Sequence, residues 1–259
     1  MTTSRHPGSL TANQLKYIAA AGMVLDSLFF AFPGRFPPVF RLLSRYVAPL
    51  FAFFVTEGWI HTRNRGRYLT RLWTAAVLME GGNLISFFLL GPGHQITENI
   101  FLTFAIACTI LRLWEREDGG SFALGLLLLA AAFWLGERPG SMGGFPIWIE
   151  GGCQMTALIL IFYGYRGDRA RQAAAWLLFD LIYITVFHAW RMPSGYPSVS
   201  VWWATLCRYS DPYTFLFLPF LLVYNGRKGS MDRIHRNFFY FFYPAHLWVL
   251  HLLAMVEAG

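Results

Sequence analysis

Ionisable side chains occur inside several apolar stretches of this chain, and their types could support chemistry. The candidates are Asp26, Glu57, Glu80, Asp180 and His246. An ionisable group near the centre of a bilayer costs on the order of 2.5–3.5 kcal/mol, so each is a functional hypothesis by default. A histidine with carboxylates nearby supplies the parts of an acid–base site, because a buried carboxylate orients the imidazole and stabilises its protonated form.

Depth narrows these candidates to three. At 1.5 Å per residue, His246, Asp26 and Glu80 are expected about 12–16 Å in from the starts of three different apolar segments. Helical spacing also places two sets of side chains on shared faces: Tyr240, Tyr243 and His246, and Trp73, Glu80 and Asn83. The structural alternatives are a hydrogen-bonded packing histidine, and an Asp26 or Glu80 that pairs with an arginine to hold helices together.

The elements that must position these groups are helices in a membrane. The chain is 56% hydrophobic and 14% charged, with a mean hydropathy of +0.42, whereas soluble proteins carry about 25% charged residues. Apolar runs long enough to cross roughly 30 Å of hydrocarbon recur along it. The sequence therefore predicts an all-α, polytopic transmembrane helical bundle that forms a single domain over residues 1–259.

Nine membrane segments are expected: about 15–33, 46–61, 69–90, 99–114, 121–136, 147–164, 172–189, 201–224 and 238–256. Asp211 and Pro212 interrupt the eighth segment. Because proline disfavours helix at and before its own position, this segment is expected as one broken helix, or as a re-entrant piece followed by a short helix.

The net charge of +7 indicates membrane orientation rather than a nucleic-acid partner. Most of the 21 Lys and Arg residues lie in the amino-terminal flank and in alternate short loops, which is the positive-inside pattern. The pattern predicts a protein of the cytoplasmic (inner) membrane, with its amino terminus in the cytoplasm and its carboxyl terminus outside. The three cysteines form no CxxC pair, so we expect neither a disulfide framework nor a metal site.

The loop between the second and third segments is strongly basic. It contains Arg63, Arg65, Arg67 and Arg71. Guanidinium groups bind phosphates through charge-assisted, often paired hydrogen bonds. The loop is therefore a candidate binding site for a phosphorylated donor, although a loop of this kind is most often an orientation signal.

Five stretches resemble the TraX family of membrane acetyltransferases, which is associated with N-acetylation of conjugative pilin. They are "LKYIAAAGMVLDSLFF" (15–30), "LSRYVAPLFAFFVTEGWIHTRNRGRYLTRL" (43–72), "MEGGNLISF" (79–87), "ENIFLTFAIACTI" (98–110) and "FFYFFYPAHLWVL" (238–250). The second is the most specific, and the last carries an aromatic-Tyr-Pro-x-His motif ending at His246. One position departs from the family pattern: Ser27 stands where a histidine usually follows the first-helix aspartate.

The resemblance implies a membrane acyltransferase that moves an acetyl group from acetyl-CoA to an amine or hydroxyl acceptor, such as a pilin or another peptide N-terminus. In this interpretation the loop arginines hold the CoA phosphates, and the thioester lies near His246, which removes the acceptor proton. Asp26 or Glu80 stabilises the resulting charge, and Tyr243 donates a hydrogen bond to the thioester oxygen. Substrate-binding roles are expected for Arg45, Glu57, Asn83 and Asn99. No metal is expected.

Two other functions fit the same residues. A proton-coupled transporter or flippase would use the buried carboxylates and the histidine as a relay, and its flux would depend on a proton gradient without release of CoA. No inverted repeat in the sequence supports it. A non-catalytic membrane scaffold would tolerate replacement of Asp26, Glu80 or His246 with effects on stability alone. The residues do not select among a peptide, a lipid and a sugar as the acceptor.

Overall fold

The structure is a computed structural model that describes residues 9–32, 34–90, 96, 98–136, 149–191, 198–208, 213–230 and 232–258. The chain divides into two compact units. Unit 1 combines Met1–Phe51 with Gly167–Gly259, and unit 2 comprises Ala52–Arg166. The single domain that the sequence predicts stays a prediction.

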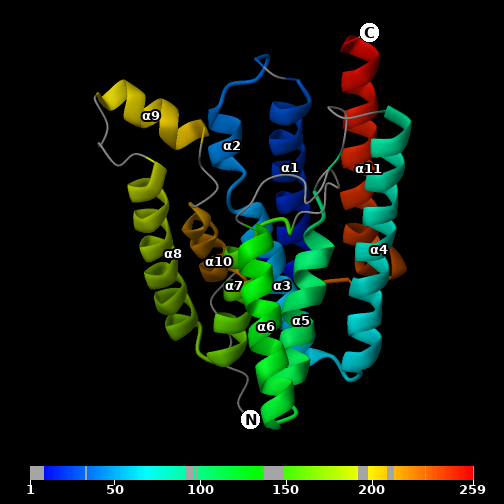
Figure 1. Cartoon of the computed structure of the whole chain (residues 1–259), viewed down its shortest axis with the longest axis vertical. Helices are drawn as coiled ribbons and strands as arrows, with labels where there is room; N and C mark the ends of the chain where they lie inside the picture. The colour runs from blue at the N-terminus through cyan, green and yellow to red at the C-terminus, as the bar shows by residue number, and fades with distance from the viewer. Residues whose placement is uncertain are drawn as a thin grey trace. The chain divides into compact units, whose positions relative to one another are not determined.

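The described residues form eleven α-helices and one 3-10 helix (Figure 1). Unit 1 contains α1 (Ala12–Ala31), α2 (Val39–Leu43), α8 (Arg169–Arg191), α9 (Val199–Arg208), η1 (Thr214–Phe217), α10 (Leu218–Val223) and α11 (Arg233–Ala258). Unit 2 contains most of α3 (Val47–His61), with α4 (Arg65–Leu90), α5 (Ile100–Trp114), α6 (Gly119–Gly136) and α7 (Gly152–Gly164). No strand occurs in this described part of the chain, which confirms the all-α prediction.

Each of the nine predicted membrane segments coincides with one or more helices. Within the described ranges, four helical stretches are long and apolar enough to cross a membrane: Val39–His61, Arg65–Leu89, Gly119–Gly136 and Asn237–Glu257. Three further apolar stretches, Ile100–Trp114, Gly152–Gly164 and Thr214–Val223, are shorter. The helices are therefore compatible with a membrane protein, whereas the number nine and the orientation of the termini stay predictions.

In unit 1 the first and last helices, α1 and α11, pack against each other. Thr11 caps α1 with a capping box: its hydroxyl accepts the Gln14 N–H, and the Gln14 side chain accepts the Thr11 N–H. Beside this cap, the Leu10 N–H donates to the Val223 carbonyl and the Asn225 N–H donates to the Leu10 carbonyl, both at 2.9 Å. The start of α1 is thereby fixed to the segment that leads into α11.

Asp180, which has no partner evident in the sequence, has a structural role in unit 1. Its buried carboxylate accepts the Thr214 hydroxyl and the Phe215 N–H, both at 2.7 Å. These bonds cap the first turn of η1 and hold it against α8. The eighth predicted segment overlaps α9, which ends at Arg208, and η1, which begins at Thr214. The predicted interruption, 211–212, lies outside the described residues.

In unit 2, α5 packs against α4, α6 and α7. The Asn99 side chain caps α5 by accepting a backbone N–H of the first turn at 3.3 Å, and Phe101 and Phe104 are fully buried on its inner face. Helices α6 and α7 approach each other at Gly136 and Gly152, where a Cβ on Gly136 would lie 2.3 Å from the Gly152 Cα. This contact requires glycine on both helices.

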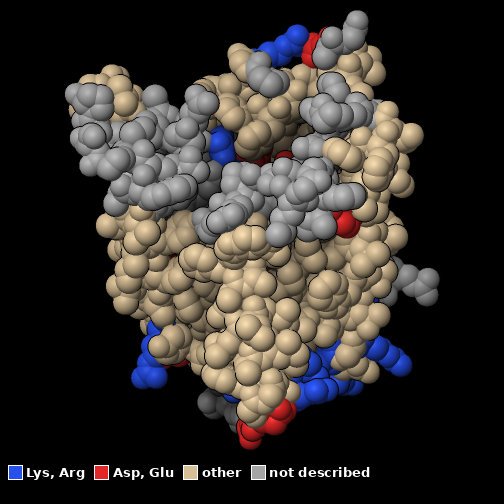
Figure 2. All heavy atoms as spheres, in the orientation of Figure 1, with Lys and Arg blue, Asp and Glu red and all other residues tan. Residues whose placement is uncertain are grey.

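The outer faces of the long helices are apolar. Leu89 on α4, Leu127 on α6 and Val256 on α11 are 77%, 68% and 82% exposed. On the face shown in Figure 2, uncharged residues make up most of the described surface. A protein in water rarely exposes so many large apolar side chains, so these faces fit contact with lipid.

Candidate functional site

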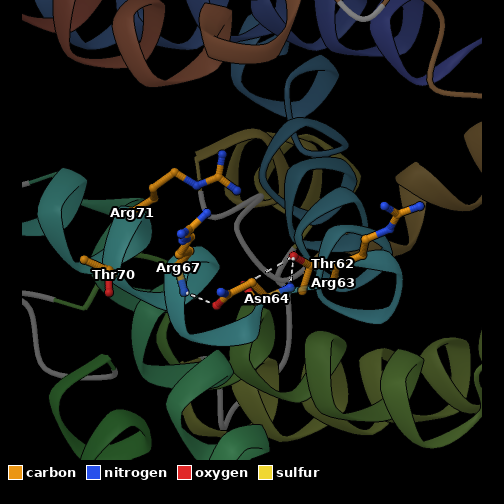
Figure 3. A pocket seen from close by; sticks show the side chains of 6 residues that line it. All are labelled: Thr62, Arg63, Asn64, Arg67, Thr70 and Arg71. Carbon is orange, nitrogen blue, oxygen red and sulfur yellow. Dashed lines mark hydrogen bonds between the residues drawn. The ribbon is translucent and has the colours of Figure 1, made fainter.

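The basic turn between α3 and α4 lines a pocket in unit 2, which we name the turn pocket. Its volume is about 560 Å³, and its lining residues are Thr62, Arg63, Asn64, Arg67, Thr70 and Arg71 (Figure 3). Asn64 caps α4, since its Oδ1 accepts the Arg67 N–H at 2.9 Å. The Asn64 N–H in turn donates to the Thr62 hydroxyl at 3.4 Å. These bonds fix the backbone from which the arginines extend.

Two arginines of the turn pocket extend to the same side. Arg67 and Arg71 are one helical turn apart on α4, and Figure 3 shows their guanidinium ends on one side while Arg63 extends away from them. The Arg71 guanidinium also lies over the Tyr68 ring, with its carbon 5.6 Å from the ring centroid. Among the described residues, none of the three arginines forms an ion pair with a carboxylate. Their charge is therefore available to an anion.

Arg65, the fourth arginine predicted to bind phosphate, lines a second pocket of about 620 Å³ in the same unit, which we name the Glu115 pocket. Arg65 forms an ion pair with Glu115 Oε1. The same oxygen accepts the Tyr163 hydroxyl at 2.8 Å and the Trp59 indole N–H at 3.2 Å. Arg112 Nη1 lies 3.6 Å from the other carboxylate oxygen. The cluster ties together the ends of α3, α5 and α7 and the start of α4.

Glu115 is the charged centre of this cluster and lies outside the predicted membrane segments. Burial alone would raise the pKa of Glu115. The hydrogen bonds from Tyr163, Arg65 and Trp59 together outweigh this effect, so the pKa lies below its usual 4.5. The carboxylate is therefore ionised at neutral pH and neutralises Arg65. Arg65 thus has a protein partner in place of the phosphate that the sequence predicts. Our sequence reasoning missed Glu115, whose sole signal is its position directly after an apolar segment.

Three predicted site residues meet between α4 and the start of α5. Asn99 Nδ2 donates to Glu80 Oε2 at 2.9 Å, and Asn83 Nδ2 donates to the Glu98 carbonyl at 3.2 Å. The predicted polar stripe on α4 therefore faces α5. Glu80 Oε1 and Asn83 Oδ1 are buried acceptors with no hydrogen-bond donor among the residues that the structure describes. Two such acceptors suit the N–H or O–H group of a ligand.

Asp26 in unit 1 is paired with Arg45, which the resemblance assigns to substrate. Arg45 Nη2 lies 2.5 Å from Asp26 Oδ1, and the Ser44 hydroxyl donates to the same oxygen at 2.8 Å. The Arg45 side chain is 12% exposed and that of Asp26 is 30% exposed. Within the described part of unit 1, Asp26 has no hydrogen bond to His246. Its pairing with Arg45 is the one that the structural alternative expects, and a role for Asp26 or Glu80 in stabilising charge on the imidazole stays a prediction.

His246 pairs with Ser27 instead. Its Nε2 lies 3.2 Å from Ser27 Oγ, and its Nδ1 lies 2.9 Å from the Phe242 carbonyl oxygen. The ring of Tyr243, the predicted hydrogen-bond donor, is buried and meets the imidazole edge-on with centroids 5.8 Å apart. Sequence reasoning identified Ser27 as a departure from the family pattern but did not place it beside the histidine.

The predicted site residues belong to both units. Unit 1 contains Asp26, Arg45, Tyr243 and His246, and unit 2 contains Arg63, Arg65, Arg67, Arg71, Glu57, Glu80, Asn83 and Asn99. Glu57 is half-buried near the end of α3, where its backbone carbonyl is 2.9 Å from the His61 ring. The common depth of Asp26, Glu80 and His246 stays a prediction.

The fold and these sites define an all-helical protein whose helices are compatible with a membrane. The chain belongs to the TraX protein family, whose model matches residues 11–254, and this confirms the resemblance. The chain is also 28% identical over 256 residues to a probable fimbrial assembly protein FimC, serogroup H1, of Dichelobacter nodosus. That match covers 93% of this chain and 94% of the relative. No solved structure matches the chain.

Proposed function

We propose that this protein is an integral membrane acyltransferase that moves an acetyl group from acetyl-CoA to an amine or hydroxyl acceptor. The turn pocket is the observation that carries the proposal, because Arg67 and Arg71 extend together into it without a described carboxylate partner. Guanidinium pairs bind phosphate through charge-assisted hydrogen bonds. CoA carries phosphates at the end remote from its thioester, so the pocket holds the donor without touching the reacting bond.

His246 is the proposed general base. Its Nδ1 is bound to a carbonyl, which leaves Nε2 to take a proton from a hydroxyl or an amine. The deprotonated group attacks the thioester carbon, the C–S bond breaks, and the CoA sulfur leaves with the proton returned by the imidazole. Tyr243 is proposed to donate to the carbonyl oxygen as negative charge develops there. Asp26 is assigned a structural role, since Arg45 and Ser44 both donate to its Oδ1.

A peptide amine, such as a pilin N-terminus, is the acceptor we favour. The family resemblance is to enzymes associated with pilin acetylation, and the name of the relative refers to fimbrial assembly. Glu80 and Asn83 offer two buried acceptor atoms to the N–H groups of such a substrate. We also propose that the turn pocket opens to the cytoplasm, since acetyl-CoA is made there and the basic loops fit that side.

Donor binding is the first test. Titration calorimetry on the purified protein in detergent would compare CoA with dephospho-CoA for the wild type, Arg67→Gln/Arg71→Gln and Arg63→Gln. Each lost charge-assisted bond is worth about 1.5–3 kcal/mol, so the double variant, which loses two, should bind CoA at least about a hundredfold more weakly. Arg63→Gln is the matched control from the same turn, and its loss should be at most about fivefold. Equal binding by the wild type and the double variant would remove the turn pocket from the function.

Turnover is the second readout of the same proposal. Release of the CoA thiol from acetyl-CoA would be followed in the presence of a short peptide with a free amino terminus. His246→Ala should lower the rate by about 10²–10⁴-fold without changing CoA affinity. Unchanged turnover would exclude His246 as the base. Proton-driven flux of a solute without thiol release would favour the transporter instead.

A further inference from the structure

The hydrogen bonds of His246 determine which of its ring nitrogens faces Ser27 as an acceptor. The Phe242 carbonyl oxygen can only accept, so His246 Nδ1, 2.9 Å away, carries the hydrogen. In the neutral ring the remaining nitrogen, Nε2, then presents a lone pair. Ser27 Oγ is 3.2 Å from it, so the serine hydroxyl donates to the imidazole. This is the direction of proton transfer that activates a serine.

Packing holds the imidazole in this orientation. The Phe242 ring stacks on it, with centroids 5.0 Å apart and planes 10° apart, and the Tyr243 ring meets it edge-on. The neighbouring Asp26 does not compete for the histidine, because its carboxylate bonds to Ser44 and Arg45. A hydroxyl, a base within hydrogen-bond reach and a third group that orients the base form the general arrangement of an activated nucleophile.

We infer that Ser27 is the nucleophile of this enzyme and carries the acetyl group as a serine ester between donor and acceptor. The inference rests on the proposed acyltransferase function and replaces direct transfer with two steps. In the first step Ser27 Oγ gives its proton to His246 Nε2 and attacks the thioester carbon. The C–S bond breaks, the sulfur takes the proton from the imidazolium, and CoA leaves as the thiol.

The second step returns the serine to its starting state. His246 Nε2 accepts a proton from the acceptor amine or hydroxyl, which attacks the ester carbon. The bond between that carbon and Ser27 Oγ breaks, and Oγ takes the proton back from the imidazolium. Acetyl-CoA and the acceptor are the sole reactants, and no oxidant, reductant or water is consumed.

The test is acetylation of the whole protein in the absence of acceptor. Wild type, Ser27→Ala, Ser27→Cys and His246→Ala, purified in detergent, would be mixed with acetyl-CoA and quenched in acid. The amount of CoA thiol released would then be compared with the intact mass and the peptide map. We expect one acetyl group on Ser27 and one thiol per wild-type chain, and neither in Ser27→Ala. Ser27→Cys should carry the group as a thioester that hydroxylamine removes.

Steady-state kinetics decides the case even where the ester is short-lived. With acceptor present, Ser27→Ala should lower kcat on the order of 10³-fold or more, and the wild type should give the parallel initial-rate lines of a two-step transfer. Ser27→Ala turnover within about tenfold of the wild type, with wild-type CoA binding, would overturn the serine ester and leave the acyltransferase standing. No thiol release from a folded wild type that binds acetyl-CoA, with any acceptor tried, would overturn both.

Discussion

Two arginine-lined pockets of unit 2 have similar volumes but differ in whether a carboxylate pairs with their arginines. In the turn pocket, Arg67 and Arg71 extend together, and no described carboxylate pairs with them. In the Glu115 pocket, Arg65 and Arg112 both contact the carboxylate of Glu115. Arg65 and Arg67 are two residues apart in the sequence and yet belong to different pockets. The number of arginines in a pocket therefore does not identify an anion-binding site. The deciding property is whether a carboxylate of the protein already neutralises the guanidinium groups.

The largest expected effect on stability comes from removing that carboxylate. Glu115→Gln leaves the Arg65 guanidinium without its counter-ion and weakens the bonds from Tyr163 and Trp59. The Glu115 side chain is only 16% exposed, so we expect a loss of about 2 kcal/mol in the free energy of unfolding. Glu117→Gln is the matched control, because Glu117 is exposed and lines the same pocket. Its effect should be within about 0.5 kcal/mol. Equal losses of unfolding free energy for Glu115→Gln and Glu117→Gln in denaturant titrations would show that the Glu115 ion pairs do not stabilise the pocket.

Replacing the arginines should have a smaller effect on stability. Arg65→Gln is expected to lower stability, whereas Arg67→Gln is expected to weaken binding. Arg65→Gln leaves a largely buried carboxylate with fewer donors, which costs about 1–2 kcal/mol of unfolding free energy. Arg67→Gln should change stability by no more than about 0.5 kcal/mol and should weaken CoA binding instead. Thermal unfolding and calorimetry on the same preparations provide both numbers. The reverse pattern would mean that the Glu115 pocket is the phosphate site.

The smallest expected effect is the dependence of the Glu115 contribution to stability on pH. Because the pKa of Glu115 is lowered in the folded protein, its contribution to stability is full above its ordinary value of 4.5. The contribution is lost as the pH falls through the lowered folded value. The unfolding temperature of the wild type should therefore fall more steeply on acidification than that of Glu115→Gln. If the unfolding temperatures of the two proteins fell in parallel with pH, Glu115 would not be the source of the acid sensitivity.

Hydropathy predicted much of the fold. Apolar runs marked the helices, since burial or lipid contact of such long runs leaves few alternatives. The interruption predicted at 211–212 lies outside the described part of the chain and stays a prediction. The spacing of Glu80 and Asn83 placed both on the face of α4 that meets α5, because helical periodicity determines which residues share a face.

Partners from distant parts of the sequence were beyond such reasoning. Periodicity places a side chain on a face but does not say which residue of another helix meets it. The sequence therefore did not predict which arginine pairs with Asp26 or with Glu115. It also did not predict that Ser27 lies beside His246. Glu115 was missed altogether, because a charged residue after an apolar segment is normally a solvated helix end. Its hydrogen bonds to Trp59 and Tyr163 depend on packing among helices that are adjacent in space but not in sequence.

Unit 1 is built from the beginning and the end of the chain, with unit 2 encoded between them. Ser27 and His246 are 219 residues apart in the sequence. A ribosome makes the amino-terminal part first, so α1 is synthesised long before the helix that carries its histidine. Until α11 emerges, the serine is an ordinary alcohol with no base beside it. Ser27 therefore gains its imidazole partner late in synthesis, and a chain released before α11 is made has no histidine beside the serine.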